Sequence, residues 1–89
     1  MLTREGDTLK VVGPMNIDSV SGLLIQSAGM LAGVSAVDLS GVTEADSSAV
    51  SLLLEWRRQV QSDVLRFTNL PPALKSLAEL YGVADLIPQ

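Results

Sequence analysis

The chain contains no cysteine and no histidine among its 89 residues. The lack of cysteine excludes disulfide bonds, thiolate nucleophiles and zinc sites built from thiolates. The lack of histidine removes the residue that most often serves as a general base or as a metal ligand. Much catalytic and metal chemistry is therefore closed to this protein before any motif is considered.

Positive charge is also scarce. Six Lys and Arg residues stand against ten Asp and Glu residues, which gives a formal net charge of −4. The basic residues form no stripe that could neutralise phosphates, so we expect no binding to nucleic acid or to anionic membrane surfaces. No apolar run is long enough for direct membrane insertion, and Met1–Glu5 lacks the apolar core of a signal peptide. These features predict a cytoplasmic protein.

Loops of the kinds that hold phosphates or metal ions are missing as well. Gly29, Gly33 and Gly41 have neither the spacing nor the lysine of a P-loop or a dinucleotide-binding loop. The carboxylates do not follow the spacing of a calcium loop. We therefore expect neither a cofactor nor a bound metal ion.

Apolar side chains are what the chain has in quantity. They make up 47% of its residues, and the mean hydropathy is +0.35. This length suits one hydrophobic core, so we predict a single domain over residues 1–89. A small domain cannot hide so much apolar surface, and we therefore expect a permanent protein partner, or self-association of the isolated protein.

Apolar periodicity and turn residues divide the chain into four strands and three helices. Gly6-Asp7 predicts a hairpin, Pro14 is expected to stop the second strand, and Gly33 and Gly82 are expected to end helices. Strands joined by helical crossovers give an α/β fold with a mixed four-stranded sheet and three main helices. The predicted strands are residues 2–5, 8–13, 35–39 and 64–70, and the predicted helices are about 20–31, 47–61 and 71–81.

The most informative segment joins a short apolar strand to an apolar helix. The strand is expected to end in a turn at Ser40-Gly41, and a few loop residues later Asp46, Ser47 and Ser48 are consecutive candidates for the N-cap of the helix. A helix N-terminus offers unpaired N–H groups and the positive end of a dipole, so it can hold an anion or a phosphorylated hydroxyl. The alternative is that Asp46 or Ser47 only caps the helix.

The helix after this motif has a wide apolar surface. At about 100° per residue its apolar side chains cover an arc of roughly 200°, whereas a helix on one face of a sheet needs an arc of only about 100°. The surplus is covered by a neighbouring helix or left for a partner. Trp56 lies at the margin of the arc, where it either anchors a protein interface or packs on the adjacent helix near Tyr81.

A catalytic role for Ser47 lacks a base. A serine nucleophile needs a positioned base, and the only candidates other than carboxylates are Lys10 and Lys75, which lie in unrelated segments. We therefore predict that the protein is not an enzyme.

The strand Val37-Asp38-Leu39-Ser40, followed by Asp46-Ser47-Ser48, a small residue and an apolar helix, resembles the STAS domain. This is the fold of bacterial anti-sigma-factor antagonists and of transporter-associated domains, and the resemblance implies a STAS-like mixed sheet over nearly the whole chain. In the antagonists the serine at the position of Ser47 is phosphorylated by a cognate kinase that is also the anti-sigma factor. Ala49 stands where those proteins usually have glycine.

The chain is more similar to MlaB-like STAS proteins, which are very short cytosolic subunits that bind the ATPase of the bacterial phospholipid-trafficking ABC transporter. This resemblance implies an accessory subunit at the cytosolic face of the inner membrane, in a system that maintains outer-membrane lipid asymmetry. Its partner would be the ATPase and, through it, a membrane permease. The resemblance lies in the short length and in residues 6–9, 37–40, 52–54, 77–81 and 86–88.

The MlaB-like resemblance implies a partner-binding surface at the start of the 47–61 helix. A phosphate on Ser47, the candidate phosphoacceptor, would add roughly −1.5 to −2 charges beside Asp46 and Glu44 and act as an off-switch. Two hypotheses stay open, namely a permanent subunit of a transporter ATPase and an anti-sigma-factor antagonist switched by phosphorylation. The expected contact residues are Asp46, Ser47, Ser48, Leu52 and Trp56, with Glu55 as a rim charge.

Overall fold

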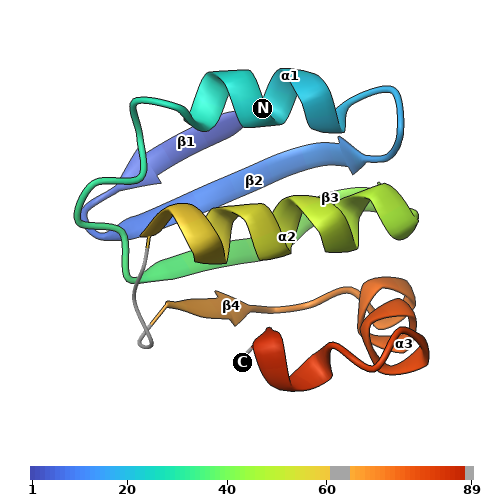
Figure 1. Cartoon of the computed structure of the whole chain (residues 1–89). Coiled ribbons are helices and arrows are strands. Elements are labelled where there is room, and N and C mark those ends of the chain that lie inside the picture. Colours follow the sequence, from blue (N-terminus) through green and yellow to red (C-terminus); the bar gives the residue numbers. More distant parts are fainter. Residues whose placement is uncertain (61–64, 88–89) are drawn as a thin grey trace.

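The computed structural model of the protein describes residues 1–60 and 65–87. These residues form four strands and three α-helices, and a short 3-10 turn, η1, follows the last helix (Figure 1). The elements are β1 (Leu2–Glu5), β2 (Thr8–Met15), α1 (Val20–Ser27), β3 (Ala36–Ala45), α2 (Ser47–Val60), β4 (Arg66–Thr68), α3 (Pro72–Leu80) and η1 (Ala84–Leu86).

The strands form one mixed sheet in the order β1-β2-β3-β4. β1 and β2 are antiparallel and are joined by a hairpin at Gly6, whose positive φ of 62° suits glycine. The pairs β2–β3 and β3–β4 are parallel, and α1 and α2 form the crossovers. The predicted fold class, a mixed four-stranded sheet with three main helices, is confirmed.

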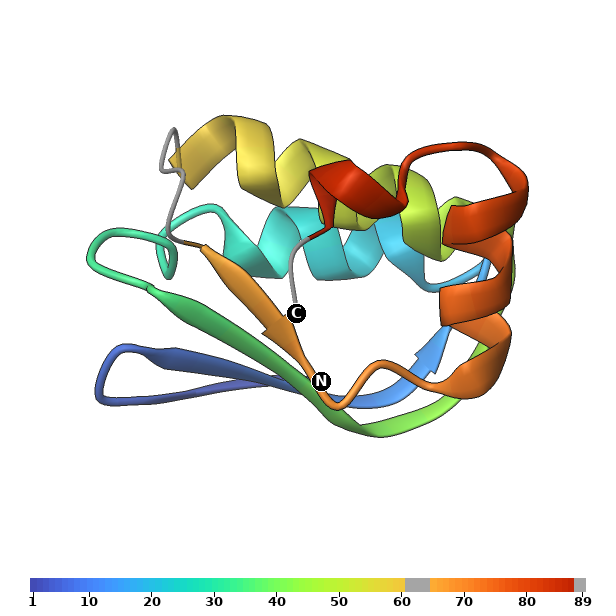
Figure 2. The same cartoon turned by 90° about the horizontal axis from the view of Figure 1, so that it is seen from below.

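The helices of the described residues all lie on one side of the sheet, and none of them covers its other side (Figure 2). Leu9 and Leu39 point to the helical side and are fully buried. On the uncovered side, Lys10 lies opposite Asp38, with Thr3 and Thr68 completing the row across the four strands. Where β2, β3 and β4 pair, core residues therefore alternate with polar residues, as expected of a sheet packed on one face.

Strands β2 and β3 are longer than their turn residues predicted. β2 continues through Pro14 to Met15, and β3 continues through Gly41 to Ala45. Pro14 lies at an irregularity in the β2–β3 pairing, between the pairs Gly13↔Val42 and Met15↔Ala45, where its missing N–H disrupts no regular ladder. At Gly41 an added Cβ would lie 2.8 Å from the Val11 carbonyl oxygen, so this glycine permits close backbone approach and does not end the strand.

Helix α1 is shorter than predicted, because it ends at Ser27 and not near residue 31. The Ser27 hydroxyl donates to the Leu24 carbonyl at 2.8 Å, and the Ala28 N–H bonds back only three residues, to Ile25, which tightens the last turn. Helix α2 runs to Val60, and the predicted boundary residues Gln61 and Val64 lie outside the described residues. None of the helices in the described ranges is long and apolar enough to cross a membrane.

Helix α3 ends as predicted before Gly82, which has a φ of 69°. The Gly82 N–H bonds to the Glu79 carbonyl and the Val83 N–H to the Ala78 carbonyl, which is the Schellman pattern. Leu74 and Ala78 are buried as expected, but Tyr81, which was expected on the same face, is 52% exposed.

One hydrogen bond inside the core joins α1 to α2. Trp56 is 0% exposed, and its indole Nε1 donates to the Ser27 Oγ at 2.8 Å. Ser27 is also fully buried, and it is the one buried polar residue of the described core. A buried indole N–H without an acceptor is costly, so this serine lets a tryptophan occupy the centre of the domain.

We predict that Ser27→Ala lowers the free energy of unfolding by about 1–3 kcal/mol, because the Trp56 N–H loses its acceptor in a dry environment. The measurement is urea denaturation followed by the fluorescence of Trp56. The matched control is Ser21→Ala, which removes an exposed hydroxyl from the same helix and should change stability by no more than about 0.5 kcal/mol. Equal losses in the two variants would contradict a role for the indole hydrogen bond.

Candidate functional site

A single residue, Asp46, separates the end of β3 from the start of α2. Its Oδ1 accepts the Ser48 N–H at 2.8 Å, and its carbonyl accepts the Ala49 N–H at 3.0 Å. Asp46 is therefore the N-cap of α2. Ser47 is the first residue of the helix and is exposed, while Ser48 is half-buried.

The second carboxylate oxygen of Asp46 reaches a different part of the chain. Its Oδ2 accepts the N–H of Ile17 at 3.0 Å, and Ile17 lies in the loop between β2 and α1. Burial of Asp46 opposes its ionisation, but the hydrogen bonds from the Ile17 and Ser48 N–H groups outweigh burial, and the pKa of this carboxyl is lowered. The charged carboxylate thus ties the β2–α1 loop to the start of α2.

The tied loop, residues 16–19, is held by further local hydrogen bonds. Asn16 Oδ1 accepts the N–H groups of Asp18 and Ser19 at 3.0 and 3.1 Å, and the Ser19 hydroxyl donates to the Pro14 carbonyl at 2.8 Å. The Asn16 amide also donates to Glu44 at the end of β3. Ile17 is thereby held in a fixed position although its side chain is 70% exposed.

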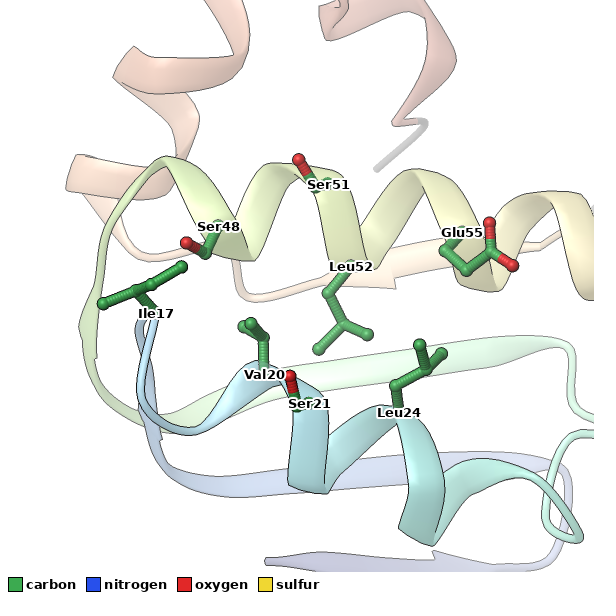
Figure 3. Close-up of a pocket in the computed structure, with 8 residues that line it drawn as sticks. All are labelled: Ile17, Val20, Ser21, Leu24, Ser48, Ser51, Leu52 and Glu55. Carbon is green, nitrogen blue, oxygen red and sulfur yellow. The ribbon is translucent and has the colours of Figure 1, made fainter.

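An apolar groove lies between α1 and α2, with a volume of about 440 Å³. Figure 3 shows the side chain of Leu52 directed from α2 toward Val20 and Leu24 on α1. We call this surface the α1–α2 groove. Its lining consists of the apolar residues Ile17, Val20, Leu24 and Leu52 and the polar residues Ser21, Ser48, Ser51 and Glu55.

A second groove of about 330 Å³, the α2–α3 groove, lies on the other side of α2. Tyr81 and Val83, which follow α3, form one wall, and Leu54 belongs to the α2 wall. Ser48 and Ser51 line both grooves, so they form a ridge of small side chains between two apolar depressions. The lining is completed by Ser47, Ser48, Val50 and Ser51.

The acidic residue on the rim of the α1–α2 groove is already paired. Glu55 Oε1 lies 2.5 Å from Nη2 of Arg58, and Gln59 donates to the same oxygen at 3.1 Å. The hydrogen bond from Arg58, followed by that from Gln59, lowers the pKa of Glu55 to about 2. This end of the groove is therefore close to neutral overall.

The structure brings most of the predicted contact residues together. Asp46 caps α2, Ser47 and Ser48 begin it, and Leu52 and Glu55 follow along the α1–α2 groove. Leu52 is only 4% exposed and contributes to the floor of this groove.

Trp56 does not belong to this surface. The side chain is fully buried and its polar atom is bonded to Ser27, so the expectation that Trp56 anchors a partner is wrong. The alternative expectation was correct that Trp56 packs on an adjacent helix but wrong about its neighbour. The helix is α1, whereas Tyr81 lines the groove on the other side of α2.

Several site residues were missed from the sequence, namely Ile17, Val20, Ser21, Leu24 and Ser51. Val20 and Leu24 were assigned to the core face of their helix. Periodicity identifies an apolar stripe, but it does not show which of its residues a neighbouring element covers and which stay accessible. Ile17 carried a usable signal, since it is a large apolar residue between Asn16 and Asp18 in the segment between a predicted strand and a predicted helix. A turn residue of this kind has no core to enter and is commonly exposed.

The described site consists of two apolar grooves, a capping carboxylate and an exposed hydroxyl. Among residues 1–60 and 65–87, no group of three or more acidic side chains converges to hold a metal ion. The possible proton acceptors named for Ser47, Lys10 and Lys75, lie on β2 and α3. Asp46 uses both carboxylate oxygens to accept backbone N–H groups. The arrangement supplies apolar grooves beside an exposed hydroxyl, which suits a protein ligand.

Comparison with known proteins gives a family and a fold. A family model described as "Mlab, STAS domain" matches residues 1–88. The anti-sigma factor antagonist SpoIIAA in its unphosphorylated form is similar in structure, with a TM-score of 0.67 and 18% identity over 98% of this chain and 84% of that chain. The phosphorylated form of SpoIIAA, described as a Bacillus cell fate determinant, has a TM-score of 0.59 and 19% identity over 98% and 86%. No curated protein sequence matches the chain.

We predict that Asp46→Ala frees the 16–19 loop while α2 persists. The amide of Ile17 should lose its protection from hydrogen exchange, because the carboxylate that accepts its proton is gone. NMR-detected exchange at single residues is the measurement. Loss of protection only in the first turn of α2, with Ile17 unchanged, would show that Asp46 is a cap and nothing more.

The same contact has a pH dependence. The pKa of Asp46 is lowered in the folded protein, so its stabilising effect is present above the ordinary value of 3.8 and is lost as the pH falls through the folded value. Wild type should therefore lose more stability than Asp46→Ala between pH 6 and about pH 2.5. Asp85→Asn, on η1, is the control for general charge effects.

Proposed function

The chain belongs to the STAS domain family, in the group described by the MlaB model, and from this membership we propose that it is the non-catalytic STAS subunit of an ABC transporter for phospholipid trafficking. It binds and supports the ATPase of that transporter, which works in outer-membrane lipid asymmetry. The observation that carries the proposal is the match of the MlaB-type family model over residues 1–88.

The surface at the start of α2 supports a role in binding a protein. Two apolar grooves flank the first half of this helix, and the ridge of Ser48 and Ser51 between them is narrow. Small residues let the backbone of a partner approach closely, and apolar walls provide the area that must be removed from water. The proposed contact residues are Asp46, Ser47, Ser48, Leu52 and Glu55, joined now by Ile17 and Ser51.

The proposal assigns different roles to this chain and to the ATPase. STAS domain proteins are generally non-catalytic regulators or accessory subunits. In the proposed complex, the ATPase binds and hydrolyses nucleotide, and this chain contributes a rigid surface. The complex would hold the chain at the cytosolic face of the inner membrane through the ATPase and its permease.

A second candidate is an anti-sigma-factor antagonist switched by phosphorylation. The observation that favours it is the exposure of Ser47 at the first position of α2, where a kinase can reach the hydroxyl. Under this candidate the partners are a serine kinase and a sigma-factor regulator, and the complex exchanges instead of persisting.

We predict that the tagged protein, purified from its native cells, brings down an ABC ATPase with its permease. Ser51→Arg should abolish this recovery, because Ser51 lines both grooves and a long charged side chain there would block the approach of a partner to either one. Ser76→Arg makes the same change at an exposed position of α3 and should retain the complex. Recovery of a serine kinase or a sigma regulator in place of the ATPase would refute the transporter proposal.

A pair of substitutions at Ser47 separates the two candidates. In a permanent subunit, Ser47→Ala keeps the complex, whereas Ser47→Asp weakens it by about tenfold or more, because it adds a like charge beside Asp46 at a desolvated surface. In a switch, the two variants drive exchange between partners in opposite directions. Binding of both variants to the purified partner, measured by calorimetry at two salt concentrations, is the test.

A further inference from the structure

We propose that the α1–α2 groove is the docking site of an amphipathic helix that carries basic residues at the end lying over Ile17. This inference rests on the proposed function in one respect, since it describes a segment of the protein partner. It goes beyond that function by stating the chemistry of the segment and the groove that receives it.

The walls of the groove fit a short stretch of helix. Its α2 wall runs from Ser48 to Glu55, two helical turns or about 10 Å. A partner helix with apolar residues at spacings of three and four places its stripe against Leu24 and Leu52 over this length. Serines on both walls, Ser21 and Ser51, leave room for its backbone.

Large apolar side chains are exposed near both ends of α1. Ile17, which lines the groove, is 70% exposed just before the helix, and Ile25 is 77% exposed near its end. The loop hydrogen bonds hold the backbone of Ile17 in place, so binding of a partner here costs little backbone conformational entropy. A pre-organised apolar side chain beside a groove is typical of an interface.

Charge distinguishes the occupant. Asp18 is adjacent to Ile17 in the chain, Asp46 accepts its N–H, and Glu44 accepts a hydrogen bond from the preceding Asn16. The ion pair of the described residues joins Arg58 to Glu55, so none of these three acidic groups is shown paired with Lys or Arg. The Ile17 end of the groove is therefore rich in acidic groups, which favours a basic partner.

This charge disfavours a second copy of the chain as occupant. A copy carries the same net charge of −4 and the same acidic residues, so a symmetric contact here would bring like charges together. A helix with Lys or Arg at the matching end gains complementary contacts instead, and its association rate rises at low salt.

The test is a titration of the isotope-labelled full chain with two synthetic helical peptides. Both carry the same leucine stripe, and they differ only in having lysine or glutamate at every polar position. The lysine peptide should bind at least about tenfold more tightly at low salt, with NMR shift changes centred on Ile17, Leu24 and Ser51. Equal affinity of the two peptides, or shift changes centred elsewhere, would overturn the proposal.

Two matched pairs of variants locate the site. Ser51→Trp, which fills the groove, should abolish binding, and Ser76→Trp on α3 should leave it unchanged. Asp18→Asn with Glu44→Gln should weaken binding of the lysine peptide several-fold, whereas Glu79→Gln with Asp85→Asn, the same change in net charge, should not. Equal effects of the two double variants would show non-specific attraction and contradict a docking site.

The outcome is independent of the pull-down from cells. If an ABC ATPase is recovered from cells but the peptide test fails, only the assignment of the docking site to the α1–α2 groove is refuted. Specific peptide binding without a transporter partner removes the proposed function and keeps the groove. A concentration-dependent dimer in sedimentation that Ser51→Trp disrupts would assign the groove to a second copy and overturn the inference.

Discussion

The direct passage from β3 into α2 is the constraint on which the rest of the site depends. With Asp46 as the only residue between the two elements, the end of the strand fixes where the helix starts. The carboxylate of Asp46 then spans from the first turn of α2 to the backbone of Ile17, so the loop before α1 is placed by the same junction. The Asp46 side chain thus contacts both walls of the α1–α2 groove, at Ile17 and at Ser48.

Helix α2 contributes residues both to the core and to the two surface grooves. Helix α2 packs against both α1 and the α3 region, and this accounts for the width of its apolar arc. Trp56 is fully buried and its indole N–H donates to Ser27, so the largest side chain of the protein stabilises the core and is not available to a partner. Recognition is left to smaller residues nearer the start of α2, where Leu52 lies at the bottom of a groove and the serines border it.

Much of the fold could be predicted from periodicity and capping signals, and the exceptions have identifiable causes. The hairpin at Gly6 and the Schellman end at Gly82 depend on local backbone preference, which a short window of sequence contains. The failures at Pro14 and Gly41 depend on the neighbouring strand, since only the pairing of β2 with β3 turns a typical turn residue into a strand residue. Helix α1 was overextended because its apolar repeat continues to Leu31, whereas the backbone hydrogen bonds tighten at Ser27 and Ala28 and the helix ends there.

The residues of the candidate site that lie close together in the sequence, at the start of α2, were predicted, whereas those contributed by α1 were not. Asp46, Ser47, Ser48, Leu52 and Glu55 follow one another from the N-cap of α2 into its third turn, and the resemblance to MlaB-like proteins implied them as contact residues. The opposite wall comes from α1, and which of its apolar residues are covered depends on the distance between two helices. Trp56 shows the same limit, because an aromatic at the edge of an apolar arc is compatible with core and with interface until the neighbour is known.

The uncovered face of the sheet bears on how such a domain can change over evolutionary time. Lys10, Asp38 and Thr68 are half-buried on this face, and among the described residues no helix packs over them to restrict the size or shape of their replacements. These positions are therefore more open to neutral drift than Leu9, Leu39 and Phe67, which are fixed by packing. Divergence can proceed on one side of the molecule without disturbing its architecture, and a shared fold at 18% identity is the expected record of such a history.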